Sequence, residues 1–234
     1  MPAKEIAEFL RASRVFAGVP AKDIDALAAV AREDPYRVRE LIFSEGDPAT
    51  RFCFVRTGHV KLFRQSRDGK DVVLELLGPG EPFGGVAVIE RRVYPASAQA
   101  TEPTVVVKIP ADPVVTLSER YASIIREMAF MIGRRLRSAH DSVKSLASDP
   151  VEARLAATLL RLAEREGVRD TAHSLTLPFH LTRQSLADMT GTTVETTIRV
   201  LSRWLKDGLV REDGNHLVVP STEALRALAR ADAE

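Results

Sequence analysis

Hydrophobic residues change their spacing along the chain and divide it into distinct segments. Between residues 3 and 32, apolar positions recur at the spacing of short helices. From about 36 to 110, short runs rich in β-branched and aromatic residues, such as FCFV and TVVVKI, alternate with turn signals that contain Gly or Pro. One of these, RQSRDGKDV, has Asp68-Gly69 between two strand-like runs and predicts a hairpin. The pattern favours an antiparallel β-sandwich or β-roll over a βαβ fold.

Residues 113–147 carry the pattern of one long helix with two apolar stripes. The first stripe has the 4-3 spacing of a coiled-coil seam and comprises Ile125, Ala129, Ile132, Leu136, Ala139, Val143 and Leu146. The second runs beside it over the first half and comprises Leu117, Tyr121, Ile124, Met128 and Met131. A helix buried within a single chain is the alternative. We favour a parallel homodimer, because the seam continues beyond the second stripe with arginines interspersed.

The sequence Ser148-Asp149-Pro150 interrupts this helix, and proline at a first helical position predicts a new helix start. We therefore expect a sensor β-roll domain with N-terminal helices (1–112), a dimerisation helix and hinge (113–148), and a C-terminal domain (149–234). In the C-terminal domain the pattern predicts helices over 151–166, 183–190 and 193–206, a short strand pair near 174–180, and a final hairpin, LVREDGNHLVV.

Two of the predicted C-terminal helices are short and are joined by a tight turn. Thr182 precedes the first helix, Gly191 supplies a residue able to adopt positive φ, and Thr192 or Thr193 caps the second helix. This arrangement is typical of a helix-turn-helix. The hairpin that follows, with Asp213-Gly214 at its tip, then corresponds to the wing of a winged helix-turn-helix.

The second of these helices places two charged residues on one exposed face. Glu195 and Arg199 lie four residues apart with Ile198 between them. In a helix-turn-helix this face enters the DNA major groove, where arginine donates to guanine and glutamate accepts from cytosine. The alternative is a surface role, in which Glu195 closes a capping box with Thr192 and pairs with Arg199. The exposed apolar Ile198 favours the DNA-binding interpretation.

The composition of the chain excludes several other classes of site and function. The net charge of +1 gives no overall basic character, so any DNA binding depends on a local surface. The single cysteine, Cys53, excludes an intrachain disulfide and a protein-ligated iron–sulfur cluster. A cupin-type enzyme needs several converging histidines, and residues 36–110 contain only His59. We therefore do not expect an enzyme. No segment has the length of a signal peptide core or a membrane helix, so we expect a cytoplasmic protein that is not membrane-bound.

The order of these segments resembles that of the Crp/Fnr superfamily of transcription regulators. The specific part is the pattern T-R-x-x-L-A-x-x-x-G-x-x-x-E-T-x-x-R-x-L, formed here by Thr182, Arg183, Leu186, Ala187, Gly191, Glu195, Thr196, Arg199 and Leu201. The resemblance implies an α+β protein: a cyclic-nucleotide-binding-like β-roll, a long dimerisation helix and a winged helix-turn-helix. It also implies a homodimer that binds palindromic double-stranded DNA, acts on RNA polymerase and responds to a small effector.

The resemblance further implies which residues touch DNA. Arg183 and Thr196 would contact phosphates, and Glu195 and Arg199 would read bases. Val194 stands where cyclic-nucleotide-type members carry an arginine. The Fnr branch also carries an apolar residue there, and this resemblance implies a TTGA-N6-TCAA-like DNA site. The full set of expected DNA-contacting residues is Thr182, Arg183, Thr192, Thr193, Val194, Glu195, Thr196, Ile198, Arg199, Ser202 and Arg203.

In the sensor domain the residues that would bind cAMP are replaced. Gly85 and Pro95 stand where the family's cyclic-nucleotide cassette has a ribose-binding Glu and a phosphate-binding Arg, so cAMP is not expected as the effector. The surrounding sequence resembles that of the Fnr and Dnr branches instead. We place a candidate effector pocket at Gly84, Gly85, Tyr94, Ser97 and His59.

The interpretation as a transcription regulator requires no cofactor. Haem is the one candidate cofactor. Its candidate ligands are His59 and His140, as in a Dnr-type sensor of nitric oxide or CO. A histidine in the position of His59, after a glycine at a strand start, is more typically a partly exposed turn residue. Cys53 is expected to be a small buried hydrophobic residue, with a thiol sensor as the alternative. An effector-independent regulator is also consistent with the sequence.

Overall fold

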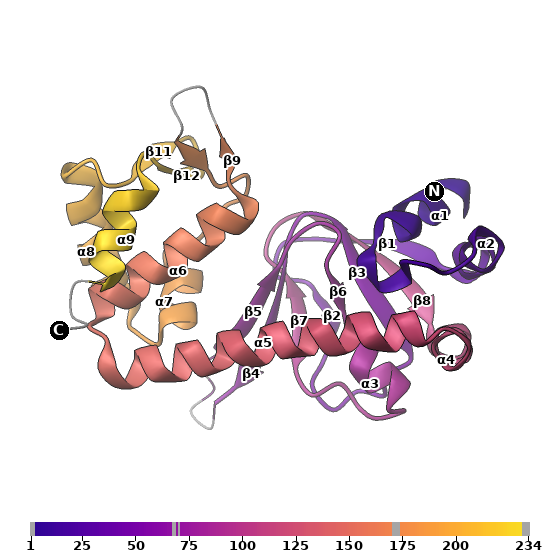
Figure 1. Cartoon of the computed structure of the whole chain (residues 1–234). Coiled ribbons are helices and arrows are strands. Elements are labelled where there is room, and N and C mark those ends of the chain that lie inside the picture. The colour runs from indigo at the N-terminus through magenta and orange to yellow at the C-terminus, as the bar shows by residue number, and fades with distance from the viewer. Residues whose placement is uncertain (1–2, 67–68, 70, 170–173, 231–234) are drawn as a thin grey trace. The chain divides into compact units, whose positions relative to one another are not determined.

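The computed structural model describes residues 3–66, 69, 71–169 and 174–230. The chain forms two compact units, one made of Met1–Arg64 and Glu75–Ser138 and the other of Gln65–Leu74 and Ala139–Glu234. Helix α5 (Ala122–Ser148) is continuous from the first unit into the second (Figure 1). The mixture of sheets and helices confirms the predicted α+β class.

Two four-stranded sheets form the β-roll of the first unit (Figure 1). One sheet has the order β1 (Arg32–Tyr36), β8 (Thr104–Pro110), β3 (Arg51–Thr57), β6 (Pro82–Phe83), and the other β2 (Leu41–Phe43), β7 (Ser97–Ala100), β4 (Val60–Gln65), β5 (Asp71–Leu77). The pairs β1–β8, β3–β8, β3–β6, β2–β7 and β4–β7 are antiparallel, as the spacing of turns predicted. The β4–β5 hairpin was expected at Asp68-Gly69, and Asp68 lies outside the described residues.

Strand β3 is buried on both faces, and its side chains alternate between two cores. Phe52 and Phe54 belong to a cluster with the helices of this unit. Cys53 and Val55 point the other way, into a smaller cluster shared with strands of both sheets. Because successive strand residues face opposite sides, a continuous apolar run such as FCFV is what a strand covered on both faces requires.

Short helices cover the β-roll and lead into the long helix. They are α1 (Ala3–Ala12), the 3₁₀ turn η1 (Arg14–Phe16), α2 (Ala21–Val30), α3 (Gly85–Ile89) and α4 (Ala111–Arg120). The prediction of one helix over 113–147 was wrong at Tyr121, which is extended and separates α4 from α5. Its hydroxyl donates to Oδ2 of Asp23 on α2 at 2.5 Å. This tertiary contact leaves no signal in the local sequence.

The two stripes of α5 have different environments in the single chain. Ile124, Met128 and Met131 are buried, whereas the large side chains of the coiled-coil stripe are 43–66% exposed. Arg135 continues the buried row, and its guanidinium pairs with Glu75 of β5 (Nε to Oε2, 2.8 Å). One helix therefore packs on its own β-roll with one face and leaves a second apolar face uncovered in the monomer.

After α5, the described part of the chain forms four helices and a four-stranded sheet, all within the second unit. The helices are α6 (Val151–Glu166), α7 (Arg183–Thr190), α8 (Val194–Lys206) and α9 (Thr222–Arg230). The strand pair expected near 174–180 was misplaced, because the strands lie at 168–169 and 175–176. The sheet has the order β11 (Arg211–Asp213), β12 (His216–Val219), β10 (Leu175–Thr176), β9 (Val168–Arg169). No helix in the described part of the chain is long and apolar enough to cross a membrane.

Candidate DNA-binding surface

The turn between α7 and α8 is fixed by threonine caps and one glycine. Thr182 caps α7 by accepting from the backbone N–H of Ser185 at 3.0 Å. Gly191 ends α7 in the left-handed conformation (φ 61°), which is strained for residues with a Cβ. Thr193, not Thr192, caps α8, accepting from the N–H of Thr196 at 3.2 Å. These local contacts define the angle at which α8 leaves the turn.

Helix α8 is amphipathic, and its two sides differ in role. Thr197, Val200, Leu201 and Trp204 are buried. The indole N–H of Trp204 donates to Oε1 of Glu152 at 2.8 Å, which anchors the inner side of α8 to the start of α6. The opposite side therefore faces away from the core of this unit.

The exposed side of α8 presents Glu195, Ile198 and Arg199, while Val194 is half-buried. Ile198 is 47% exposed, so an apolar side chain is available to contact a partner between the two charged residues. Arg199 makes no hydrogen bond or ion pair with any described residue. The ion pair Glu195–Arg199, one part of the alternative interpretation, is thus not formed among the described residues. In place of the capping box with Thr192, the Glu195 carboxyl bonds locally to its own backbone N–H and to the Thr193 hydroxyl.

Glu195 is held in its ionised form. Its own backbone N–H and the Thr193 hydroxyl lower the pKa of its carboxyl below the ordinary value. An ionised carboxylate accepts hydrogen bonds and donates none. Glu195 and Arg199 together thus offer an acceptor and a donor, side by side and exposed, as reading a cytosine–guanine pair requires.

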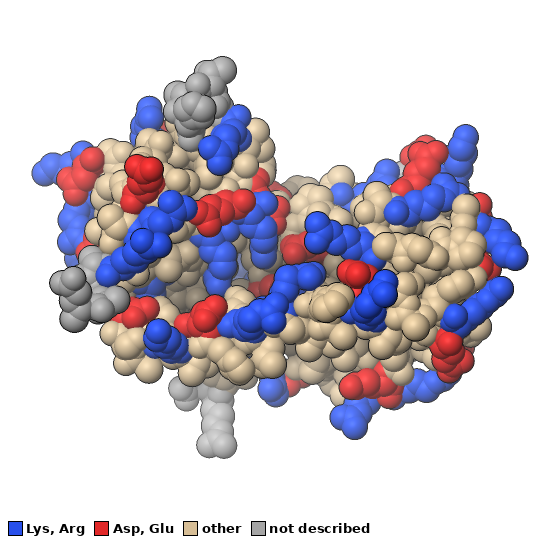
Figure 2. All heavy atoms as spheres, viewed as in Figure 1, with Lys and Arg blue, Asp and Glu red and all other residues tan. Residues whose placement is uncertain are grey.

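The other two arginines of the expected DNA-contacting set are ion-paired. Arg183, at the start of α7, contacts Glu212 of β11, and Arg203 of α8 contacts Glu152 of α6. Basic and acidic side chains are also interspersed over the face drawn in Figure 2. Among the three arginines, only Arg199 has its full charge available.

A further arginine, which sequence reasoning missed, ties the hinge to the helix-turn-helix. The guanidinium of Arg154 in α6 donates to three carbonyl oxygens, those of Asp149 (2.8 Å), Thr190 (3.0 Å) and Gly191 (3.4 Å). A Cβ on Gly191 would also lie 2.7 Å from Cδ2 of Leu146. The end of α5 and the hinge therefore both contact the α7–α8 turn, and no local pattern could have indicated this.

In the β-roll, three of the expected effector-pocket residues have structural roles. Tyr94 is buried and stacks on Phe43, with ring centroids 3.7 Å apart, and its hydroxyl donates to the carbonyl oxygen of Arg51 at 2.6 Å. Gly84 is left-handed (φ 75°), and a Cβ there would lie 2.9 Å from the Tyr94 ring. A Cβ on Gly85 would lie 2.5 Å from the ring of Phe52. These residues pack against each other and the core.

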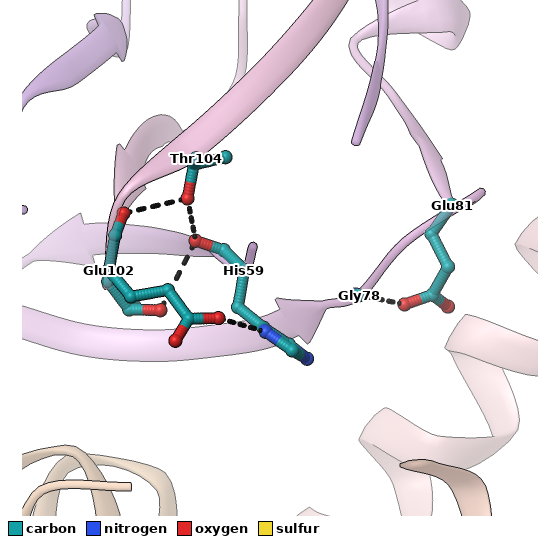
Figure 3. Close-up of polar contacts among 6 residues, drawn as sticks. His59, Gly78, Glu81, Glu102 and Thr104 are labelled. Carbon is teal, nitrogen blue, oxygen red and sulfur yellow. Dashed lines mark hydrogen bonds and ion pairs between the residues drawn. The ribbon is translucent and has the colours of Figure 1, made fainter. Parts of the chain in front are cut away.

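The remaining two pocket candidates also serve local structure. The expectation of an exposed His59 was wrong, since it is 3% exposed and its Nδ1 lies 2.6 Å from Oε1 of Glu102. Figure 3 shows its backbone oxygen accepting from Thr104 as well, which ties the β3–β4 turn to the β7–β8 turn. The hydroxyl of Ser97 accepts from the N–H of Glu45 at 2.9 Å.

Cys53 lies in the interior of the β-roll. It is fully buried, and this burial raises the pKa of its thiol to about 12. Since the thiolate is the reactive form, Cys53 is a packing residue, as the sequence predicted. His140, the second haem candidate, lies exposed on α5.

Comparison with known proteins identifies both units. Residues 33–121 match the cyclic nucleotide-binding domain and residues 153–228 match the Crp-like helix-turn-helix domain. The "Cyclic AMP receptor protein" of Thermus thermophilus is 30% identical, over 86% of this chain and 90% of its own length. The "Transcriptional activator protein anr" of Pseudomonas aeruginosa is 29% identical, over 91% and 87% respectively.

A solved structure agrees with these relatives. FixK2 from Bradyrhizobium japonicum superposes with a TM-score of 0.75 at 27% identity and covers 85% of this chain and 97% of its own. The order of β-roll, long helix and helix-turn-helix, together with these relationships, establishes the family: this chain belongs to the Crp/Fnr superfamily of transcription regulators.

Proposed function

We propose that this regulator binds an inverted repeat of the TTGA-N6-TCAA type as a homodimer, with α8 in the major groove. The observation that carries the proposal is the exposed pair on α8. Arg199, unpaired among the described residues, would donate to guanine, and Glu195, kept ionised, would accept from the paired cytosine. Val194 and Ile198 beside them are apolar and can contact thymine methyl groups but cannot donate to a further guanine.

The homodimer is supported by the uncovered stripe of α5. Side chains of this size, repeating every three and four residues and 43–66% exposed, match the seam of a two-stranded coiled coil. A two-fold dimer presents two recognition helices, so its half-sites should lie one helical turn apart, about 34–36 Å. Such a dimer would then act on transcription through RNA polymerase.

Selection of binding sites from a random DNA library tests the proposal directly. We expect enrichment of an inverted repeat with TTGA-like half-sites six base pairs apart. Val194 predicts that TGTGA half-sites are not enriched, because no side chain at that position can donate to the additional guanine. Enrichment of TGTGA, or of sequences without two-fold symmetry, would contradict the assignment of α8 and of the dimer.

We further infer that cAMP is not the effector and that the protein regulates without one. The support is that the five expected pocket residues pack against, or hydrogen-bond to, the β-roll itself. A Dnr-type haem sensor remains the competing hypothesis. An absorbance spectrum of the purified protein distinguishes the effector-free regulator from the haem sensor. Bound haem would give an intense absorbance band at the violet end of the visible spectrum. Such a band, lost on His59→Ala or His140→Ala, would overturn the effector-free assignment.

A further inference from the structure

The ion pair between Arg183 and Glu212 joins two elements that would lie beside the same DNA backbone. Arg183 is the first residue of α7, and Glu212 lies in β11 of the wing. One guanidinium nitrogen of Arg183 contacts Oε1 of Glu212. In helix-turn-helix proteins the first helix crosses the DNA backbone. The carboxylate of Glu212 therefore pairs with the guanidinium group of Arg183, which a DNA phosphate would otherwise contact.

The register of the wing explains why Glu212 reaches α7 and its neighbour does not. Glu212 is opposite Leu217, which is buried, whereas Asp213 is opposite His216, which is exposed. Directly opposed residues of an antiparallel pair share a face, and successive residues alternate between faces. Glu212 thus lies on the inner face of the hairpin and Asp213 on the outer face, although both carry the same charge.

We propose that Glu212 competes with DNA phosphate for Arg183 and so weakens the binding of every sequence alike. This inference rests on the proposed binding mode of α7 and α8. While the pair is intact, the guanidinium charge is compensated by protein and displaces no counterion from DNA. When Arg183 moves to a phosphate, the carboxylate of Glu212 is left next to a polyanion. Both effects oppose binding.

The exposure of the pair sets the size of the effect. The side chain of Arg183 is 31% exposed and that of Glu212 is 45% exposed, so water screens their attraction. Exposed pairs of this kind change an equilibrium constant by roughly 1.5- to 5-fold. A pair of this strength can be exchanged for a phosphate, and its removal should not unfold the domain.

The test measures binding of the full-length protein to two duplexes, the selected inverted repeat and a scrambled sequence, over a range of salt concentrations. Glu212→Gln should bind both duplexes roughly 1.5- to 5-fold more tightly than the wild type. Its dependence on salt should be steeper by about one phosphate contact. Asp213→Asn is the matched control, since it removes the same charge from the next residue of the same strand but contacts no arginine among the described residues.

The same substitutions in an Arg183→Ala background complete the cycle. There the gain from Glu212→Gln should fall to that of Asp213→Asn, because the competition no longer exists. Weaker binding by Glu212→Gln would mean that Glu212 orients Arg183 toward DNA and would overturn the proposal. Equal gains from both wing variants would do so too, as they would reflect only long-range charge. If the wild type bound neither duplex, the proposed function itself would fail, an outcome easily told apart from these.

Discussion

The helix-turn-helix and the β-roll treat their expected functional residues in opposite ways. On α8, Glu195, Ile198 and Arg199 face solvent, and Arg199 has no partner among the described residues. In the β-roll, Tyr94 and His59 are buried and bonded to the protein itself. Helix α8 exposes an arginine that is unpaired among the described residues beside a glutamate with only local hydrogen bonds, whereas the β-roll uses its candidate residues in internal packing and hydrogen bonds. The comparison supports our proposal that DNA recognition depends on the exposed side of α8 and that the residues expected to form an effector pocket serve the packing of the β-roll.

The largest expected effect comes from the helix that the two units share. Leu136→Glu would place two carboxylates face to face across the proposed seam, and desolvation costs several kcal/mol for each ion. We expect the dimer to dissociate and affinity for the inverted repeat to fall to that of one half-site. Light scattering measures the mass. Arg134→Glu adds the same group on the opposite side of α5 and should leave the dimer intact; a dimer in both variants would contradict the seam.

The second-largest expected effect concerns the two arginines that we propose contact DNA, Arg199 and Arg183. Arg199→Ala should cost about 1–3 kcal/mol at the guanine and relax specificity at that base pair. Arg183→Ala should instead weaken all sequences by a similar factor, since phosphate contacts carry no sequence information. Binding to a panel of single-base variants distinguishes the two patterns. A uniform loss for Arg199→Ala would remove Arg199 from base recognition.

A third prediction concerns how tightly the β-roll is packed at Gly85. Gly85→Ala should destabilise folding by about 1–3 kcal/mol, because its Cβ would overlap the Phe52 ring. Gly133→Ala on α5 serves as the control, since its Cβ meets only Arg137 at 3.5 Å. Alanine is the better helix former there, by about 1 kcal/mol. Urea unfolding should give changes of opposite sign; a neutral Gly85→Ala would show room for a ligand.

The smallest expected effect is none. Calorimetry with cAMP at millimolar concentration should give no heat above dilution, and cAMP should not change the affinity for DNA. The reason is chemical, since Gly85 and Pro95 provide neither a carboxylate for the ribose nor a cation for the cyclic phosphate. Binding coupled to DNA affinity would show that other side chains have taken over this role.

Local patterns predicted α7, α8 and the turn between them well, because the signals lie within a few residues of one another. The cap at Thr193, the turn at Gly191 and the spacing of Glu195 and Arg199 all follow from short-range geometry. The β-roll was predicted as a fold for a similar reason, since turn signals and apolar runs recur along it.

The residues that the sequence did not reveal depend on distant partners. Tyr121, where the helix is interrupted, hydrogen-bonds to Asp23, almost a hundred residues away. Arg154 acts through carbonyl oxygens on three separate backbone positions, and carbonyls have no sequence signature. His59 looked exposed because Gly58 precedes it, and its burial depends on Glu102. Contacts of this kind become visible only when the strands and helices are placed together.

The anchor of α8 on α6 gives the protein an intrinsic optical probe. The chain contains one tryptophan, Trp204, and its indole donates to Glu152, two residues after the hinge proline. All tryptophan emission therefore arises from the point where α8 meets the start of α6, next to the hinge. A change in packing at this point can be followed by intrinsic fluorescence, without any label.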